Sequence, residues 1–408
     1  MDHRSGLPIV GMVGGGQLAR MTHQAAIALG QTLSVLSVGP DESAARVTPD
    51  VTLGSHLDFE ALEAFASSCD VVTFDHEHVP GEFIDRLVQA GHEVHPGAEA
   101  LIFAQDKLQM RQRLAQLGFP IPRWSKIASV AQLEQFAGDR WPVVLKAARG
   151  GYDGKGVWMI EDPAAAVEVV DQCVKDGIEL LVEERVVLRR ELAAVVARSK
   201  FGQVAAWPVV ETLQQDGICV EVIAPAPQLP PALAVQATEL AISLADHLGV
   251  TGILAVELFE VDGPDGVSIL VNELAMRPHN SAHWTIDGSV TSQFEQHLRA
   301  VLDYPLGATT ARARWTVMAN VLGGEPGGTP LDERVHHLMA RWPQIKIHLY
   351  GKQVRPGRKI GHVTITGADL SSLRTSARAA AQYLSDGKLP ESSGAADRSR
   401  NEVERSRG

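Results

Sequence analysis

A glycine-rich segment between two apolar runs, KAARGGYDGKG at residues 146–156, constrains the fold more than any other part of the sequence. The apolar run 143–145 ends at Lys146, and a second run follows at 157–160. Two strands joined by a glycine-rich turn predict a hairpin flap. Its backbone amides, together with the ammonium groups of Lys146 and Lys155, suit a polyphosphate ligand.

The chain before this flap alternates strand and helix patterns. An apolar strand at 8–13 ends in three glycines, a helix with apolar period 3.6 follows at 17–29, and strand and helix patterns continue to about residue 100. This alternation predicts a parallel sheet with covering helices. Gly11–Arg20 also resembles a dinucleotide fingerprint, but its glycine spacing is wrong, so it favours a helix N-terminus that receives an anionic ligand.

From Val143 the pattern changes to hairpins. Helices are expected at 106–117, 233–248 and 292–302, and strands at 143–146, 156–160, 180–184, 192–198, 203–210, 255–259, 268–273, 316–322 and 346–350. The predicted fold class is α/β and α+β, in an N-terminal domain 1–100, a central domain 101–305, a small C-terminal β-rich domain 306–384 and a disordered tail 385–408.

Composition excludes several classes of function. The formal net charge of −12 argues against general nucleic-acid binding, which needs a basic footprint. No apolar run reaches the about 18 residues that a membrane span needs, and the first apolar run reads as a strand and not as a signal peptide. Cys69, Cys173 and Cys219 are far apart and read as idle thiols of a reducing compartment. We therefore expect a cytoplasmic protein with small-molecule partners.

Two glutamates fall on neighbouring strands joined by a short turn. Glu257 follows Val256 and points away from the core, while Glu273 is expected on the same face as Val271 and opposite Asn272. Paired carboxylates across a hairpin suit Mg²⁺, which prefers oxygen ligands and substrate phosphates. The alternative is a solvated pair on an outer face. The apolar surroundings favour the metal.

A second acidic group follows the strand that ends near Val182. Residues 183–186, EERV, and Glu191 suit a hinge whose backbone reads adenine while a carboxylate accepts ribose hydroxyls. A solvated strand end is the alternative. Lys107 and Lys146 likewise have ordinary interpretations as lysines at the ends of a helix and a strand.

Two polar segments concentrate hydrogen-bond donors. The run GKQVRPGRKIGH places Lys352, Arg355, Arg358 and Lys359 around one Pro-Gly turn, which suits a phosphomonoester, although a solvated basic loop is the alternative. The segment 277–283, RPHNSAH, directly follows the strand of Glu273 and is dense in polar side chains.

Taken in order, these pieces resemble the ATP-grasp superfamily and, more closely, the 5-(carboxyamino)imidazole ribonucleotide synthases of purine biosynthesis. The resemblance spans roughly residues 11–362 and is carried by GGGQLAR, GGYDGKG, VVETLQQDGI, VNELAMRPHNSAHWT, SQFEQHLRA and RPGRKIGH. It implies a pre-ATP-grasp domain, an ATP-grasp domain and a small C-terminal domain. It also implies an ATP-dependent ligase that carboxylates 5-aminoimidazole ribonucleotide with bicarbonate through carboxyphosphate, and it implies a homodimer.

The resemblance also implies roles for individual residues. The metal Mg²⁺ would be held by Glu257 and Glu273. The ribonucleotide would be bound by Gln17, Glu77, Lys352, Arg355 and Arg358. Bicarbonate and the amine would be surrounded by Tyr152, Asp153, Arg277, His279, Asn280 and Lys352, with Asp153 helping to remove the amine proton. ATP would be held by Lys107, Lys146, Gly151, Tyr152, Asp153, Gly154, Lys155, Gly156, Val157, Glu183, Glu184, Arg185, Val186, Glu191, Gln214, Asn272 and Glu273.

Two positions depart from the pattern of the superfamily. Ala275 stands where many members carry an asparagine, which removes a third protein ligand for the metal, and Gln214 stands where relatives often carry histidine. Two other classes of function stay open from the residues alone. A non-catalytic nucleotide-binding regulator would keep Lys146 and the hinge, and a nicotinamide-dependent oxidoreductase would use only the first domain.

Overall fold

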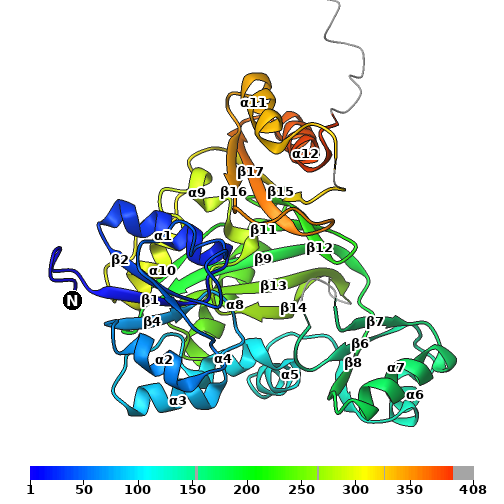
Figure 1. Ribbon diagram of the computed structural model, residues 1–408. Coiled ribbons are helices and arrows are strands. Elements are labelled where there is room, and N and C mark those ends of the chain that lie inside the picture. The colour runs from blue at the N-terminus through cyan, green and yellow to red at the C-terminus, as the bar shows by residue number, and fades with distance from the viewer. Residues whose placement is uncertain (152–154, 264–265, 326, 389–408) are drawn as a thin grey trace, which may run out of the picture.

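The N-terminal part of the chain forms a parallel sheet, as predicted (Figure 1). The structure is a computed structural model, and it describes residues 1–151, 155–263, 266–325 and 327–388. The sheet has the strand order β3-β2-β1-β4, with β1 (Ile9–Val13), β2 (Thr32–Ser37), β3 (Val51–Leu53) and β4 (Val71–Phe74). Its strands are connected by α1 (Gln17–Leu29), α2 (Phe59–Ala66) and α3 (Gly81–Gln89).

Helix α1 begins and ends where its sequence predicts. Leu18, Met21 and Ala26 are buried, as the apolar period requires. Gly30, at a φ of 67°, ends the helix in the left-handed conformation that glycine adopts without steric cost. Helix α1 is therefore fixed with its N-terminus at the carboxyl end of β1.

The glycine-rich turn belongs to a small antiparallel sheet of order β5-β8-β6-β7. Strand β6 (Val143–Ala147) pairs with β7 (Val157–Ile160), and Lys146 lies opposite Val157, which confirms the predicted hairpin. The remaining strands are β5 (Trp124–Ile127) and β8 (Leu180–Glu184). Two helices that were not predicted, α6 (Val130–Ala137) and α7 (Pro163–Lys175), pack on the sheet and close its core.

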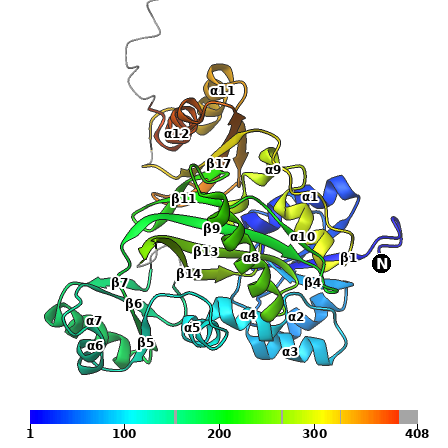
Figure 2. The same cartoon turned by 180° about the vertical axis from the view of Figure 1, so that it is seen from behind.

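A large sheet, antiparallel between neighbouring strands, occupies the centre of the molecule (Figure 2). Its first strands are β14 (Gly266–Ala275), β13 (Gly252–Gly263), β9 (Leu188–Arg198), β11 (Val210–Gln215) and β12 (Ile218–Ala224). The strand predicted at 203–210 is interrupted, because β10 (Val204–Ala206) ends before Pro208, which cannot donate to a ladder. Helices α8 (Pro231–His247) and α10 (Gln293–Val301) cover β9 and β13.

The C-terminal strands continue this central sheet. Strand β15 (Trp315–Leu322) pairs with β12 and is followed in the sheet by β17 (Lys359–Gly367) and β16 (Lys346–Leu349). Helices α11 (Leu331–Arg341) and α12 (Leu370–Asp386) pack on these strands. Helix α12 runs two residues into the predicted tail, and residues 389–408 of that tail lie outside the described residues. The residue boundaries of the three domains stay a prediction.

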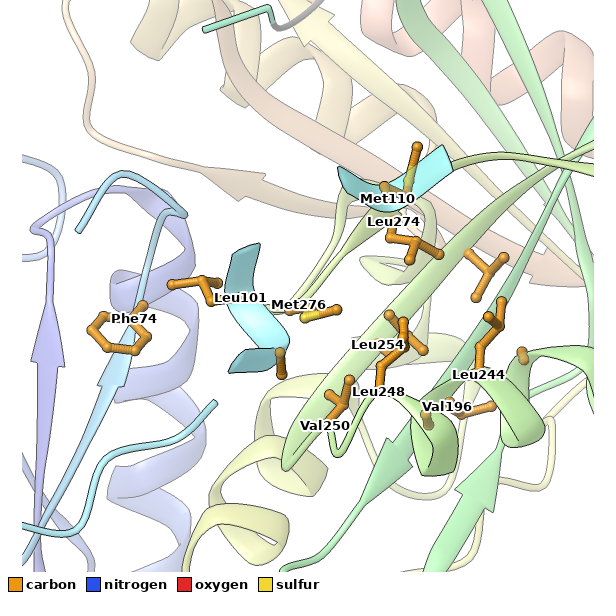
Figure 3. Packing of buried hydrophobic residues seen from close by; sticks show 14 of the residues in the cluster. Phe74, Leu101, Met110, Val196, Leu244, Leu248, Val250, Leu254, Leu274 and Met276 are labelled. Carbon is orange, nitrogen blue, oxygen red and sulfur yellow. The ribbon is translucent and has the colours of Figure 1, made fainter. Parts of the chain in front are cut away.

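One buried apolar cluster joins the N-terminal unit to the central sheet. Helices α4 (Ala98–Gln105) and α5 (Lys107–Gln116) lie at this junction. Figure 3 shows Leu101 of α4 between Phe74 of the N-terminal sheet and Met276 just beyond β14. Burial of such side chains stabilises the fold by about 1.5–3 kcal/mol each, so it holds the two units together. Among the described residues, no helix has the length and apolar character to cross a membrane.

Candidate active site

A single large cleft brings most of the predicted site residues together. Its volume is about 1620 Å³, and the N-terminal sheet, the flap sheet, the central sheet and the C-terminal strands all contribute to its walls. The predicted residues that line it are Gln17, Glu77, Lys107, Lys146, Gly151, Val157, Glu183, Glu184, Arg185, Val186, Glu191, Gln214, Glu257, Asn272, Glu273, Arg277, His279 and Asn280. Lys155, Gly156, Lys352, Arg355 and Arg358 are not in this lining, and Tyr152, Asp153 and Gly154 lie outside the described residues.

Glu257 and Glu273 face each other across β13 and β14, as predicted for antiparallel neighbours. The predicted position of Asn272 is wrong. The ladder pairs Glu257 with Glu273 but Leu258 with Val271, so Asn272 is the extra residue of a bulge. The bulge turns Asn272 into the cleft beside Glu273, where its amide donates to Glu257 Oε2 at 3.3 Å.

The two carboxylates repel each other. The Glu257 side chain keeps 33% of its surface exposed, but that surface lies inside the cleft. Burial raises the pKa of Glu257 to about 7, and repulsion by Glu273 and Glu191 adds to the rise. Lys107 partly offsets this charge, because its Nζ binds Glu273 Oε1 at 2.6 Å.

Lys107 is positioned by the start of α5. The Asp106 side chain caps that helix by accepting the N–H groups of Leu108 and Gln109 at 2.9 and 3.0 Å. The same carboxylate binds Arg149 Nε at 2.9 Å, and the Lys107 N–H donates to the Ala148 carbonyl at 2.8 Å. These bonds fasten the base of the glycine-rich turn to α5.

Lys146 is held by a buried charge cluster. Glu183 binds Lys146 Nζ at 2.8 Å and Arg111 Nε at 2.6 Å, and the three side chains are at most 10% exposed. Burial lowers the pKa of Lys146, while the Glu183 carboxylate raises it. The Glu183 carboxylate is therefore paired with two cations of the protein, and which hinge carboxylate accepts ribose hydroxyls stays a prediction.

Arg111 was missed by the sequence analysis. Its NH2 group also donates to the Asn272 carbonyl at 2.8 Å, so it holds the bulge of β14 in place. Nothing in the pattern of α5 separates this arginine from a solvated one. Only its burial identifies it.

The rest of the hinge remains open to the cleft. Glu184 accepts the Arg123 N–H at 2.8 Å at the end of β8, and Arg185 and Val186 follow without secondary structure. Glu191 lies on β9, where the Gln214 side chain hydrogen-bonds to it. Burial raises the pKa of Glu191, and this hydrogen bond opposes the rise.

The N-terminus of α1 already has an anionic partner. The Asp75 carboxylate accepts the N–H groups of Gly16 and Ala19. A Cβ at Gly16 would lie 2.1 Å from Asp75 Oδ2, so a glycine is required there. Burial raises the pKa of Asp75 to about 6. An anionic side chain of the protein itself thus occupies these two N–H groups, and an anionic ligand at this turn stays a prediction.

Glu77 joins the N-terminal unit to the segment after β14. Its Oε1 accepts the Met276 N–H at 2.9 Å, and its Oε2 binds Arg277 NH2 at 3.2 Å. Glu77 therefore orients Arg277 in the cleft. His279 Nε2 follows at 3.6 Å from Glu257 Oε1, while the Asn280 and Asn320 side-chain amides bind each other at 2.7 and 3.0 Å.

The basic loop lies at the rim of the cleft. Lys352 donates to Gln17 Oε1, so these two predicted residues do meet. Arg355 and Arg358 are exposed and bind the Gln353 side chain and carbonyl, at 2.9 and 3.4 Å. Of the four cations that the sequence predicts around a phosphomonoester, Lys359 is the one that lines the cleft.

The carboxylate pair fits a divalent cation that takes most of its ligands from a substrate. Within the described residues, no group of three or more His, Cys, Asp or Glu side chains could hold a metal ion. Ala275 offers no side-chain oxygen, as expected. Two facing carboxylates, with the pKa of Glu257 raised by burial and by the charge of Glu273, nevertheless favour a cation, and Mg²⁺ commonly uses one or two carboxylates plus phosphates.

The fold and the paired carboxylates with their two lysines define the ATP-grasp class of proteins. Sequence profiles agree: the ATP-grasp domain matches residues 112–294, the ribonucleotide synthetase preATP-grasp domain matches 7–105, and the phosphoribosylaminoimidazole carboxylase C-terminal domain matches 316–376. The chain belongs to the family of N5-carboxyaminoimidazole ribonucleotide synthases.

Two curated relatives carry that name. The protein of Mycobacterium bovis is 60% identical over 383 residues, covering 93% of this chain and 89% of the relative. That of Corynebacterium ammoniagenes is 49% identical over 388 residues, covering 94% and 93%.

Solved structures of this family are also similar. The synthetase of Thermus thermophilus has a TM-score of 0.80 at 35% identity, over 93% of this chain and 99% of that one. The synthase of Aspergillus clavatus in complex with ADP and 5-aminoimidazole ribonucleotide has a TM-score of 0.82 at 30% identity, over 92% and 98%.

Proposed function

We propose that this chain joins bicarbonate to the exocyclic amine of 5-aminoimidazole ribonucleotide, with cleavage of ATP to ADP and phosphate. The product is 5-(carboxyamino)imidazole ribonucleotide, an intermediate of purine biosynthesis. The observation that carries the proposal is the pairing of Glu257 with Glu273 in one cleft with Lys107, Lys146 and Arg277. Family membership at 60% identity supports the same substrates.

ATP is placed along the flap sheet and the hinge. Lys107 and Lys146, which line the cleft, would face the phosphates, and the backbone of 183–186 with Glu191 would offer groups for the adenosine. A bound Mg²⁺ would be held by Glu257 and Glu273, and it would offset negative charge on the phosphate oxygens. Lys107 would release Glu273 when the nucleotide arrives, because its ammonium group then has a phosphate to bind.

The chemistry proceeds in two steps. A bicarbonate oxygen attacks the γ-phosphorus, the bond to the β-phosphate oxygen breaks, and carboxyphosphate and ADP result. Carboxyphosphate then loses phosphate to give CO₂, and the amine nitrogen attacks the CO₂ carbon while its proton passes to a base. Arg277, oriented by Glu77, is placed to bind the carboxylate oxygens. Asp153 remains our proposal for the base, although it lies outside the described residues.

The ribonucleotide is placed between the N-terminal unit and the basic loop. Gln17 and Lys352 meet there, and Lys359 supplies a cation from the cleft wall for the phosphomonoester. Arg355 and Arg358 lie farther out and would complete the site only if the loop moved inward. Close positioning of the amine beside the released CO₂ supplies rate, since effective molarities reach about 10⁵ M or more.

The test is phosphate release from ATP with bicarbonate, with and without 5-aminoimidazole ribonucleotide. We expect strong stimulation by this ribonucleotide and none by glycinamide ribonucleotide or biotin. ATP binding without any stimulated hydrolysis would favour a nucleotide-binding regulator and would overturn the proposal. The homodimer stays a prediction that analytical ultracentrifugation can test, and the cytoplasmic location stays a prediction that cell fractionation can test.

A further inference from the structure

Gln293 is a fully buried polar residue whose side chain turns toward the segment 279–283. It is the first residue of α10, after the N-cap Ser292, and its exposed fraction is 0%. Its Oε1 accepts the His279 N–H at 2.7 Å, and its Nε2 donates to the His279 carbonyl at 2.8 Å. The same Nε2 lies 2.9 Å from His283 Nδ1. One amide therefore holds both histidines of this segment.

These bonds determine the tautomer of His283. A backbone N–H only donates and a carbonyl only accepts, so the two bonds to His279 fix which end of the Gln293 amide carries the nitrogen. Both protons of Nε2 are then used, one on the His279 carbonyl and one on His283 Nδ1. His283 Nδ1 is consequently an acceptor, and the proton of the neutral ring sits on Nε2.

His279 is held in the same tautomer by Ser281. The Ser281 N–H donates to His279 Nδ1 at 3.4 Å, and the Ser281 hydroxyl lies 2.9 Å from that nitrogen. The proton of His279 therefore sits on Nε2, the atom 3.6 Å from Glu257 Oε1. The ring is neutral in this arrangement, because Nδ1 accepts the Ser281 N–H and carries no proton of its own.

His283 also connects this segment to the C-terminal strands. Its ring lies 5.6 Å from Phe294, 6.4 Å from Tyr350 and 5.2 Å from His362, measured between ring centroids. The Tyr350 hydroxyl binds His362 Nδ1 at 2.7 Å, and Tyr350 stands two residues before Lys352. A shift of the His283 ring would thus disturb its packing against Tyr350 and His362, next to the basic loop.

We propose that Gln293 is a positioning residue for the carboxylation: its amide holds the backbone of His279 and the tautomer of His283, so that both rings, His279 with the help of Ser281, offer a neutral Nε2–H donor in the lining of the cleft. Such donors suit the oxygens of bicarbonate and carboxyphosphate, because they bind oxygen without adding a charge beside Glu257 and Arg277. The proposal rests on the proposed function for its kinetic part, but not for the tautomers.

Gln296 provides a matched control. It lies on the same helix, is also 0% exposed, and clamps Gly307 with the same bond pattern, N–H to Oε1 and Nε2 to carbonyl, each at 2.8 Å. Gly307 does not line the cleft. Gln293→Met and Gln296→Met should therefore destabilise the fold to a similar extent, while only Gln293→Met disturbs the two imidazoles.

Two measurements test the proposal. Long-range ¹⁵N–¹H spectra of the ligand-free protein should show His283 protonated on Nε2, and the signals that disappear in His283→Gln identify this ring. In Gln293→Glu the proton should move to Nδ1, because a carboxylate only accepts hydrogen bonds. In steady-state assays, Gln293→Met should lower kcat about 100-fold, the loss typical of a misplaced group, with the KM for ATP within about twofold.

Gln293→Asn, which keeps the amide, should recover part of that kcat, and Gln296→Met should keep it within about twofold. An Nδ1–H tautomer in the parent protein, or equal kcat values for the two methionine variants, would overturn the proposal. If the unsubstituted protein shows no phosphate release stimulated by the ribonucleotide, the proposed function is overturned. The spectra would still decide whether Gln293 fixes the tautomer of His283.

Discussion

The buried carboxylate of Glu183 gives the sharpest test of how the cleft holds Lys146, the lysine that we propose binds phosphate. Its two oxygens bind Lys146 Nζ at 2.8 Å and Arg111 Nε at 2.6 Å, with the three side chains 3%, 10% and 1% exposed. Glu183→Gln keeps the shape of the side chain but removes its charge. Two cations are then left buried beside each other without a counter-charge.

The expected loss of stability is large. Removing one partner of a buried ion pair costs about 3–5 kcal/mol, because the remaining charge stays in a poorly polarisable environment. At about 2–4 °C for each kcal/mol, the Tm of Glu183→Gln should fall by roughly 6–20 °C. Differential scanning calorimetry measures this change.

A second effect should appear in nucleotide binding. Burial lowers the pKa of Lys146 and Glu183 raises it, so removing the carboxylate lowers this pKa further. Only the charged amine binds phosphate strongly, so ATP affinity is present below the pKa of Lys146 and is lost as the pH rises through it. In Glu183→Gln that loss should occur at lower pH, which calorimetric titration of ATP between pH 6 and 9 would detect.

The neighbouring Glu184 is the control for both measurements. Its side chain is 38% exposed and pairs with Arg123 only at 4.0 Å. Glu184→Gln should cost less than about 1 kcal/mol, as exposed ion pairs do, and should leave the pH profile of ATP binding unchanged. Equal Tm values and equal profiles for the two variants would refute the reasoning.

Three further predictions concern the other charges of the cleft. Below the pKa of Glu257, about 7, a proton competes with the metal, so Mn²⁺ affinity with a non-hydrolysable ATP analogue should fall about tenfold per pH unit below pH 7 and be flat above it. A flat profile throughout would count against it. Lys107→Met should tighten Mn²⁺ binding without nucleotide by about tenfold in spin-resonance titrations, because Glu273 loses its counter-ion; unchanged binding would contradict this. Lys359→Met should raise the KM for the ribonucleotide by about tenfold, because one charged hydrogen bond is lost, whereas Arg355→Met should change this KM less than about threefold. A larger effect of Arg355→Met would contradict the assignment of Lys359 to the phosphomonoester.

Local patterns predicted the elements that carry the site. The glycine-rich turn between two apolar runs predicted the β6–β7 hairpin, and the spacing of Glu257 and Glu273 around a short turn predicted that they face each other. Helix α7 was equally readable, because Asp162 caps it, Pro163 begins it, and Ala166 and Val170 form its apolar stripe. It was overlooked because the hairpin interpretation was extended too far.

Other features of the site could not be read from local patterns. Arg111 occurs in a polar helix, and only the packing of α5 against β8 and β14 turns it toward Glu183. Asp75 and Gly16 are 59 residues apart, and their contact depends on how β4 lies beside β1. A buried charge needs a partner of opposite charge, and here that partner comes from a distant element. The spacing of residues along the sequence does not show which distant element this is.

The amino-acid sequence alone determined the alternation of strands and helices, the flap hairpin and the carboxylate pair, because each depends on residues close together in the chain. Tertiary structure alone decided that a bulge brings Asn272 beside Glu273, that Glu183 pairs with Lys146 and Arg111, and that β15 extends the central sheet. The physical reason is the range of the interactions. Backbone periodicity and turn chemistry act over a few residues, whereas ladder register and the pairing of buried charges depend on which distant segments pack together.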